Sequence, residues 1–316
     1  MTSVRDVFFN RIYELVQDGE DIYIITADLG APSLDDFRKD FPDRYISVGI
    51  AEQNLISVAA GMAMAGKKVI AYGLNPFPAT RAFDQIRTLL AELNIPLTVC
   101  ALNAGVCAAE CGYTHMPIED MAILRTLSNV RVFNPSDEVI SYKLADDTCS
   151  LAFPRFIRFD KFISGKRYTK QDIDFDRGYT IAKRLVSRDR ALSIVANGIF
   201  IPKLIDLLNS EKYDRVQLID MYGVPVDELS LITILNDSDN IITIEENVLP
   251  GGIGAYILEI LSDYNICKPV RRLGLKFAEG YYDVYTSREY IERDQGLDDK
   301  AILRNIDDIL EMEGDK

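Results

Sequence analysis

Residues 48–66 read VGIAEQNLISVAAGMAMAG, and Glu52 is the single charged side chain in this stretch. The amides of Gln53 and Asn54 follow it, and small or apolar residues then continue to Gly66. An acid at a helix start commonly complements the helix dipole, which is worth about 0.3–1 kcal/mol. The flanks of Glu52 are uncharged and apolar, however, so we expect this carboxylate to lie at depth, where it needs a partner. The stretch therefore predicts a helix that begins with a polar cluster in a buried interface.

Short β-rich runs alternate with helical stretches on both sides of this segment. The expected elements are, in chain order, helix 4–16, strands 22–26 and 45–48, helix 52–66, strand 68–72, helix 79–93, strand 97–102, helix 118–127, strand 130–133, helix 136–147 and strand 155–159. Strands and helices that alternate at this spacing predict a parallel sheet with helices on both faces. After strand 130–133, Ser136 is expected to cap the next helix.

The polar segment 164–185 interrupts this alternation and is interpreted as a linker or an edge segment. A second alternation follows, with strands at 191–196, 215–220, 240–246 and 269–273 and helices at 201–209, 226–236, 253–262 and 299–312. A chain of 316 residues suits about two domains. The sequence thus predicts an α/β protein with two parallel or mixed sheets, in a first domain at 1–163 and a smaller second domain at 186–316.

Composition and charge exclude several classes of protein. Hydrophobic residues make up 48% of the chain, which is too apolar for a mainly disordered protein. The formal charge of -14 opposes nucleic acid and anionic membranes as partners. Five cysteines without a Cys-x-x-Cys pair, together with a single histidine, argue against a metal site. The sequence shows no signal-peptide layout and no apolar run near the ~20 residues that cross a bilayer, so we expect a cytoplasmic protein with reduced thiols.

Several motifs, in a fixed order, resemble the transketolase group of thiamine-diphosphate enzymes. In the first half these are TADLGAPS (26–33), VGIAEQN (48–54), RAFDQIR (81–87), GYTHMPIED (112–120), NPSDE (134–138) and FIRFDK (156–161). In the second half they are IVANG (194–198), IDMYGVPVDE (219–228), TIEENVLPGGIGA (243–255) and VRRLGLK (270–276). The resemblance covers essentially the whole chain. It implies a pyrimidine-binding domain followed by the transketolase C-terminal domain.

The resemblance gives Glu52 a catalytic role, in addition to the structural role of a cap. In this family the matching glutamate hydrogen-bonds N1′ of the aminopyrimidine of thiamine diphosphate and so activates the cofactor. This needs a carboxyl group that can share a proton, which burial among apolar neighbours favours. The resemblance also assigns Phe77, within GLNPFPATRAF, to stacking on the aminopyrimidine, and Phe83 to the cofactor site. Either aromatic side chain could instead be part of the core.

The resemblance places the substrate near His115, the only histidine in the chain. His115 follows strand 97–102, and open α/β sheets bind ligands at the carboxyl ends of their strands. A lone histidine can also be purely structural, but the match to the family's T-H-x-P motif implies a role in proton transfer and substrate binding. Arg158 is expected to contact a sugar phosphate. Cys111 and Asn103 stand where transketolases carry a substrate-reading aspartate and a phosphate-binding histidine, so sugar stereochemistry and phosphorylation stay open.

One part of the family pattern is missing from the sequence. Related enzymes hold the diphosphate and Mg²⁺ with a G-D-G…N-N segment of another domain, and this chain contains no G-D-G. We therefore interpret it as the C-terminal subunit of a split transketolase, which would move a two-carbon ketol unit between sugar phosphates. The diphosphate-binding half would be a separate partner subunit that holds most of the thiamine diphosphate and its Mg²⁺, in an α2β2-type assembly. The alternatives are a 2-oxoacid dehydrogenase β-type subunit, a deoxyxylulose-phosphate-synthase-like enzyme, and a non-catalytic scaffold.

Overall fold

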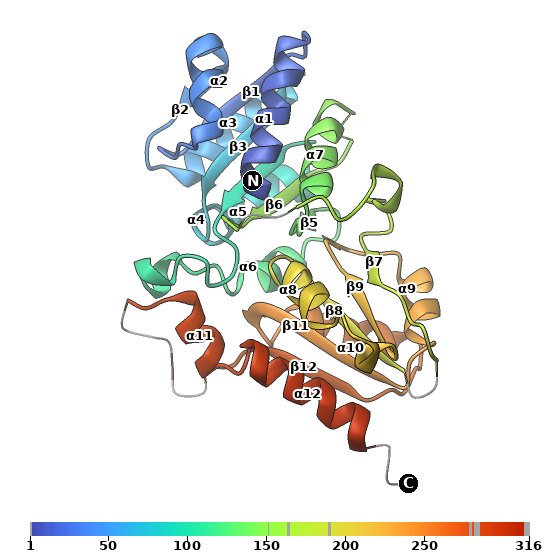
Figure 1. Ribbon diagram of the computed structural model, residues 1–316. Coiled ribbons are helices and arrows are strands. Elements are labelled where there is room, and N and C mark those ends of the chain that lie inside the picture. The colour runs from blue at the N-terminus through green and yellow to red at the C-terminus, as the bar shows by residue number, and fades with distance from the viewer. Residues whose placement is uncertain are drawn as a thin grey trace.

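The first half of the chain supplies six strands of a seven-stranded sheet (Figure 1). The order of the strands is β10-β5-β6-β4-β3-β1-β2, and the seventh strand, β10 (Gly223–Val224), comes from the second half. The computed structural model describes residues 2–150, 152–162, 165–188, 191–277, 280 and 285–312. The strands from this half are β1 (Ile22–Thr26), β2 (Tyr45–Ser47), β3 (Lys68–Leu74), β4 (Thr98–Leu102), β5 (Arg131–Phe133) and β6 (Arg155–Phe159). Their pairings with one another are parallel, as predicted.

Helices cover both faces of this sheet, because successive side chains of a buried strand point to opposite sides. On one face lie α1 (Val4–Gln17), α2 (Asp35–Asp40) and α7 (Glu138–Asp147), whose core includes Phe8, Phe37, Ile140 and Leu144. On the other face lie α3 (Glu52–Met64), α6 (Asp120–Leu124) and the π-helical segment η3 (Ile86–Glu92), whose core includes Leu55, Ile86, Leu90 and Met121.

The second half forms a five-stranded sheet with the order β12-β11-β8-β9-β7. Its strands are β7 (Thr180–Lys183), β8 (Leu192–Ala196), β9 (Val216–Asp220), β11 (Asn240–Val248) and β12 (Val270–Leu275). Its helices are α8 (Phe200–Leu207), α9 (Glu228–Leu235), α10 (Ile253–Asp263), α11 (Arg288–Asp294) and α12 (Asp299–Met312). Only β7 is antiparallel to its neighbour within the described sheet. The predicted class, two α/β domains with parallel and mixed sheets, is confirmed.

Two short strands connect the halves to their sheets. The segment interpreted as a linker or an edge segment, 164–185, contains β7, which pairs with β9 at the edge of the second sheet. The short strand β10 (Gly223–Val224) comes from the second half but pairs with β5 of the first sheet. The predicted boundary at residues 163 and 164 lies outside the described residues. Each sheet is therefore completed at one edge by a short strand that the alternation of strands and helices in the sequence does not reveal.

Some helix ends also differ from the prediction. The expected helix 79–93 is divided into α4 (Phe77–Thr80), α5 (Phe83–Gln85) and η3. The cap of α7 is Asp137, whose carboxylate accepts a hydrogen bond from the Val139 amide at 2.7 Å. The predicted cap, Ser136, lies one residue before the cap position, and its hydroxyl donates to Asp220 of the second domain.

The two domains meet at the carboxyl ends of strands from both sheets. Asn247, near the end of β11, donates to Asp120 of the first domain at 3.1 Å. Arg288 of α11 bonds both Glu246 of β11 and Asp160, which follows β6. The second domain thus covers the carboxyl ends of β5 and β6, whereas a cavity of about 390 Å³ opens beside the carboxyl ends of β1 and β2.

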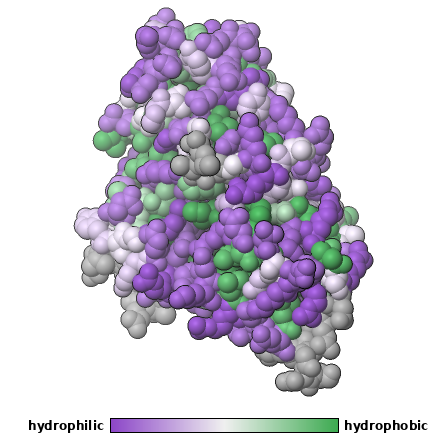
Figure 2. Space-filling view, viewed as in Figure 1, coloured by the Kyte–Doolittle hydropathy of each residue, from purple (hydrophilic) through white to green (hydrophobic). Residues whose placement is uncertain are grey.

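The face of the molecule seen in Figure 2 is mainly hydrophilic, with smaller apolar areas between the polar ones. Across the described part of the chain, no helix is long and apolar enough to cross a membrane.

Candidate active site

The parallel sheet brings Glu52, Phe77 and His115 to the side of the molecule where its strands end. Glu52 follows β2, Phe77 follows β3, and the loop with His115 follows β4. Because parallel strands all end on the same side of the sheet, these three segments approach one another across its open part.

Glu52 is the first residue of α3 and is only 3% exposed. Its Oε2 accepts a hydrogen bond from Nη1 of Arg81 at 2.7 Å. The expectation that Glu52 lies at depth is confirmed, and its partner is a cation. Gln53 and Asn54 are exposed in this chain, so a partner surface over them stays a prediction.

Arg81 links the buried acid to the predicted aromatic residue and to the histidine. Its guanidinium carbon lies 4.4 Å from the centre of the Phe77 ring. The Phe77 ring in turn meets the His115 ring edge to face, with centroids 5.3 Å apart and an interplanar angle of 79°. The hydroxyl of Thr114 lies 3.0 Å from Nδ1 of His115. These contacts form a continuous group, which we call the Glu52–His115 cluster: Glu52, Arg81, Phe77 and His115.

Arg81 opens the motif RAFDQIR (81–87), and from the sequence acids on or near its own helix would be its expected partners. Its actual partner is Glu52, 29 residues earlier in the chain. The only signal in the sequence was its position, four residues after Phe77, which one helical turn places beside that ring. Phe83 is partly buried on α5, and its role in cofactor binding stays a prediction.

Two predicted substrate residues lie inside the protein. Arg158 is 1% exposed, and its Nε donates to Oδ2 of Asp120 at 2.7 Å. Asn103 is buried and adopts a positive φ of 78°, and its Oδ1 accepts from Sγ of Cys107 at 3.6 Å. In this arrangement neither side chain faces an open surface. A direct contact of Arg158 with a sugar phosphate would require a rearrangement that opens a path to its buried guanidinium.

The second domain contributes a side chain next to the His115 loop, which the sequence did not predict. Tyr285 is 78% exposed, and its ring passes 3.2 Å from the point where a Cβ on Gly112 would lie. The amide of Thr286 donates to the carbonyl of Ala109 at 3.2 Å, which holds this segment in place. Gly112 itself needs to be glycine because its φ is +78°. Cys111, the predicted substrate-reading position, is exposed beside it.

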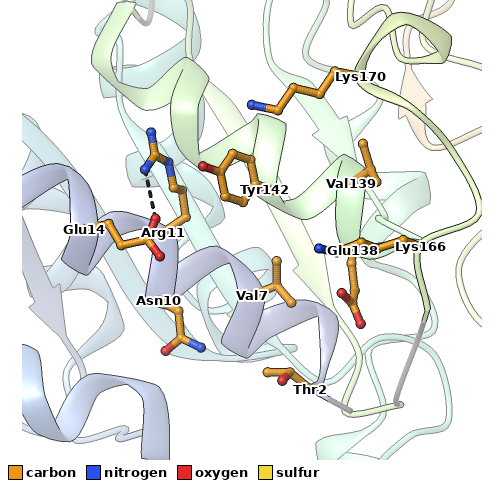
Figure 3. Close-up of a pocket in the computed structure, with 10 residues that line it drawn as sticks. All are labelled: Thr2, Val7, Asn10, Arg11, Glu14, Glu138, Val139, Tyr142, Lys166 and Lys170. Atoms are coloured by element: carbon orange, nitrogen blue, oxygen red, sulfur yellow. Dashed lines mark hydrogen bonds and ion pairs between the residues drawn. The ribbon is translucent and has the colours of Figure 1, made fainter.

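A separate cavity of about 480 Å³ lies between α1 and α7, on the face of the first sheet opposite to α3. Figure 3 shows that its lining combines charged side chains with Val7, Val139 and Tyr142, and that Arg11 and Glu14 pair with each other within it. None of the predicted site residues lines it. The Glu52–His115 cluster lies instead at the carboxyl ends of the strands. Across the described residues, no group of three or more His, Cys, Asp or Glu side chains is placed to hold a metal ion.

Two buried carboxylates of the second domain have raised pKa values: Asp220, at the end of β9 beside Ser136 of the first domain, and Glu245 of β11. Burial raises the pKa of Asp220 to about 7, although hydrogen bonds from Ser136 and Tyr168 lower it, and the nearby Asp137 adds to the increase. Burial likewise raises the pKa of Glu245 to about 7. The carboxylate accepts hydrogen bonds from the amides of Ile253 and Gly254 at 2.8 and 2.9 Å, and these bonds lower the pKa but do not cancel the effect of burial.

The raised pKa of Asp220 predicts a pH-dependent stability. An unfolded aspartate titrates near pH ~4. Between this pH and about 7 the folded chain therefore keeps a proton that the unfolded chain releases, so the free energy of unfolding falls as the pH rises. We expect Asp220→Asn to be more stable than the unmodified chain by about 1–4 kcal/mol at pH ~8, and nearly equal to it at pH ~4.5, in urea unfolding. Equal destabilisation at both pH values would contradict this assignment.

Both halves of the chain match family models of transketolase. Residues 1–161 match the model described as transketolase, pyrimidine binding domain, and residues 182–302 match the model described as transketolase, C-terminal domain. The chain therefore belongs to the transketolase family.

Three known proteins indicate its position within the family. The chain is 27% identical over 307 residues to a subunit of the apulose-4-phosphate transketolase of Actinobacillus succinogenes, covering 95% of this chain and 96% of that protein. It is 31% identical over 311 residues to 1-deoxy-D-xylulose-5-phosphate synthase of Caldanaerobacter subterraneus, covering 96% of this chain but 48% of the synthase. A solved structure described as a split gene transketolase, inactive beta4 tetramer, matches with a TM-score of 0.82 and 28% identity, over 98% of this chain and 99% of that one. The chain thus corresponds to a separate subunit in some relatives and to about half of a longer protein in others.

Proposed function

We propose that this chain is the pyrimidine-binding subunit of a split, thiamine-diphosphate-dependent transketolase that transfers a two-carbon ketol unit between sugar phosphates. The observation that carries the proposal is the buried carboxylate of Glu52, at the open edge of the first sheet and joined through Arg81 to Phe77. The half-exposed side chain of Arg81 is what separates this buried acid from solvent, so a ligand could reach it. The family match supports the cofactor and the reaction class.

The residues present fit the aminopyrimidine of the cofactor. The flat guanidinium of Arg81 already lies against the Phe77 ring while it donates to Glu52, so this space accepts a planar group with hydrogen-bond donors. Thiamine diphosphate, when bound, supplies the carbon that accepts and releases the two-carbon unit. In our proposal Glu52 shares a proton with the ring nitrogen, and Phe77 packs on the ring face. His115 moves protons at substrate oxygens from the other side of Phe77.

A partner subunit would complete this site. Several uncharged side chains are exposed around the start of α3 and along it: Ile50 is 76% exposed, Gln53 and Asn54 are exposed beside Glu52, and Met64 is 67% exposed at the other end of the helix. Exposed apolar side chains such as Ile50 and Met64 can be covered by a partner protein. We infer that a diphosphate-binding subunit covers them, holds Mg²⁺ and the diphosphate, and forms an α2β2-type assembly with this chain. The self-associated relative described as a beta4 tetramer supports the assembly, and the free thiols of all five cysteines agree with a cytoplasmic location.

The reaction can be tested with the chain and a candidate diphosphate-binding subunit. We expect the mixture, with thiamine diphosphate and Mg²⁺, to transfer a ketol unit from xylulose 5-phosphate to an aldose phosphate. Decarboxylation of pyruvate without ketol transfer would favour the dehydrogenase-type or synthase-type alternatives, of which the synthase is supported by the 31% identical relative. Cofactor binding without turnover of either donor would favour a scaffold.

A further inference from the structure

Arg81 lies where the proposed function needs the cofactor ring. Its Nη1 donates to Glu52 at 2.7 Å, and its guanidinium carbon lies 4.4 Å from the Phe77 ring centre. A guanidinium is planar, carries hydrogen-bond donors at its edge and stacks on aromatic faces. An aminopyrimidine is also planar and stacks on aromatic faces, and its ring nitrogen can hydrogen-bond a carboxyl group when the two share a proton. The side chain therefore makes, within the chain itself, the two contacts that the ring would make with Glu52 and Phe77.

Arg81 and the cofactor ring cannot both occupy the same face of Phe77 and the same oxygen of Glu52. The face of Phe77 toward Arg81 is occupied at stacking distance, and Oε2 of Glu52 holds one donor of Arg81. Arg81 itself is anchored loosely, because its side chain is 50% exposed whereas that of Glu52 is 4% exposed. The buried acid and the ring are thus fixed, and the arginine is the member of the cluster that can move into solvent.

Resting on the function proposed above, we propose that Arg81 is a placeholder residue of the pyrimidine site: it neutralises Glu52 and covers Phe77 in the unassembled chain, and the cofactor displaces it. The arginine prevents the buried carboxylate from being left without a partner, which would be costly for the folded chain. On assembly, the aminopyrimidine takes over both contacts and the guanidinium turns outward. Arg81 therefore weakens cofactor binding while it protects the empty site.

The proposal predicts that removing the guanidinium strengthens cofactor binding. A half-exposed ion pair and a cation–π contact are each worth up to about 1 kcal/mol, so their loss corresponds to a roughly three- to twentyfold lower Kd. We would measure Kd for thiamine diphosphate with Mg²⁺ by calorimetry, using this chain with its diphosphate-binding partner, for the unmodified chain, Arg81→Gln and Arg81→Lys. Arg81→Gln should bind more tightly than the unmodified chain. Arg81→Lys should fall between them, because lysine keeps the charge but not the flat stacking surface.

Arg87→Gln is the matched control. Arg87 lies on the same segment, is similarly exposed and pairs with Asp84 at 2.9 Å, away from the cluster. Its replacement should leave Kd unchanged. A thermal melting curve of each free chain gives a second readout: Arg81→Gln should melt lower than the unmodified chain and gain more on addition of cofactor and partner.

The outcomes separate this inference from the proposed function. If the unmodified pair binds thiamine diphosphate but Arg81→Gln binds equally or more weakly, the arginine is an anchor or a bystander and the placeholder role is wrong. If no variant, including the unmodified chain, binds the cofactor in the presence of the partner, the proposed function itself is contradicted.

Discussion

Replacing Glu52 by glutamine is expected to lower ketol transfer by about 10²–10⁴-fold in the assembled pair, the usual range for a positioned acid or base. Glutamine has nearly the same shape and can still accept a hydrogen bond from Arg81, so the fold should be kept. It cannot share a proton with a ring nitrogen, however, and this is the step that the account assigns to the buried carboxyl group. Turnover should fall, whereas KM for the sugar donor should change little.

Asp84→Asn is the control for this experiment. Asp84 is an exposed acid that pairs with Arg87 on the helical segment near the cluster, and its loss removes the same charge without touching the site. It should retain nearly full activity. Full activity of Glu52→Gln under the same conditions would mean that the carboxylate is only a helix cap with an ion-pair partner.

The largest effect on stability is expected at Asp120, a fully buried acid at the junction of the two domains. Its Oδ2 accepts from Arg158 at 2.7 Å and from the amide of Asn75 at 2.6 Å, and its Oδ1 accepts from Asn247 at 3.1 Å. Asparagine in this position has one acceptor instead of two and turns its own amide toward these donors. It also leaves the guanidinium of Arg158 buried without a counter-charge. We expect Asp120→Asn to reduce the free energy of unfolding by about 3–5 kcal/mol in urea.

The exposed pair of Asp35 and Arg38 provides the comparison. Asp35→Asn should change the free energy of unfolding by less than about 1 kcal/mol, because exposed ion pairs contribute little. A loss at Asp120 as small as the loss at Asp35 would show that the interdomain junction rearranges without it, and the contact between β11 and the first domain would then carry little of the stability.

The sequence predicted the depth of Glu52 correctly because that prediction rests on a local property. The stretch after Glu52 is uncharged and mostly apolar, and one face of its helix packs into the protein, with Glu52 at the start of that face. The parallel strands then follow from alternation, and their common direction is enough to bring residues 52, 77 and 115 to one edge. The partners of these residues could not be predicted in this way, because the pairing of Glu52 with Arg81 joins two segments that no sequence periodicity connects.

The interdomain residues show a second limit of the sequence. The strand β10 is two residues long, and its pairing with β5 is a tertiary contact without a period of its own. In the same way, serine is a residue type that often caps helices, but the hydroxyl of Ser136 donates to Asp220 and Asp137 caps the helix. Arg158, at the end of a strand, has the sequence pattern of a ligand-binding residue, yet the second domain and Asp120 enclose it. Each difference arises where the second domain covers the strand ends of the first.

In our proposal, the cofactor site of this chain is half of a site that a second polypeptide completes. Calorimetry with thiamine diphosphate and Mg²⁺ on this chain alone, and then on its mixture with the diphosphate-binding subunit, distinguishes a shared site from a complete one. We expect no tight binding by the chain alone and saturable, Mg²⁺-dependent binding by the mixture, with one cofactor for each copy of this chain. Tight, Mg²⁺-dependent binding by the chain alone would mean that the site is complete without a partner.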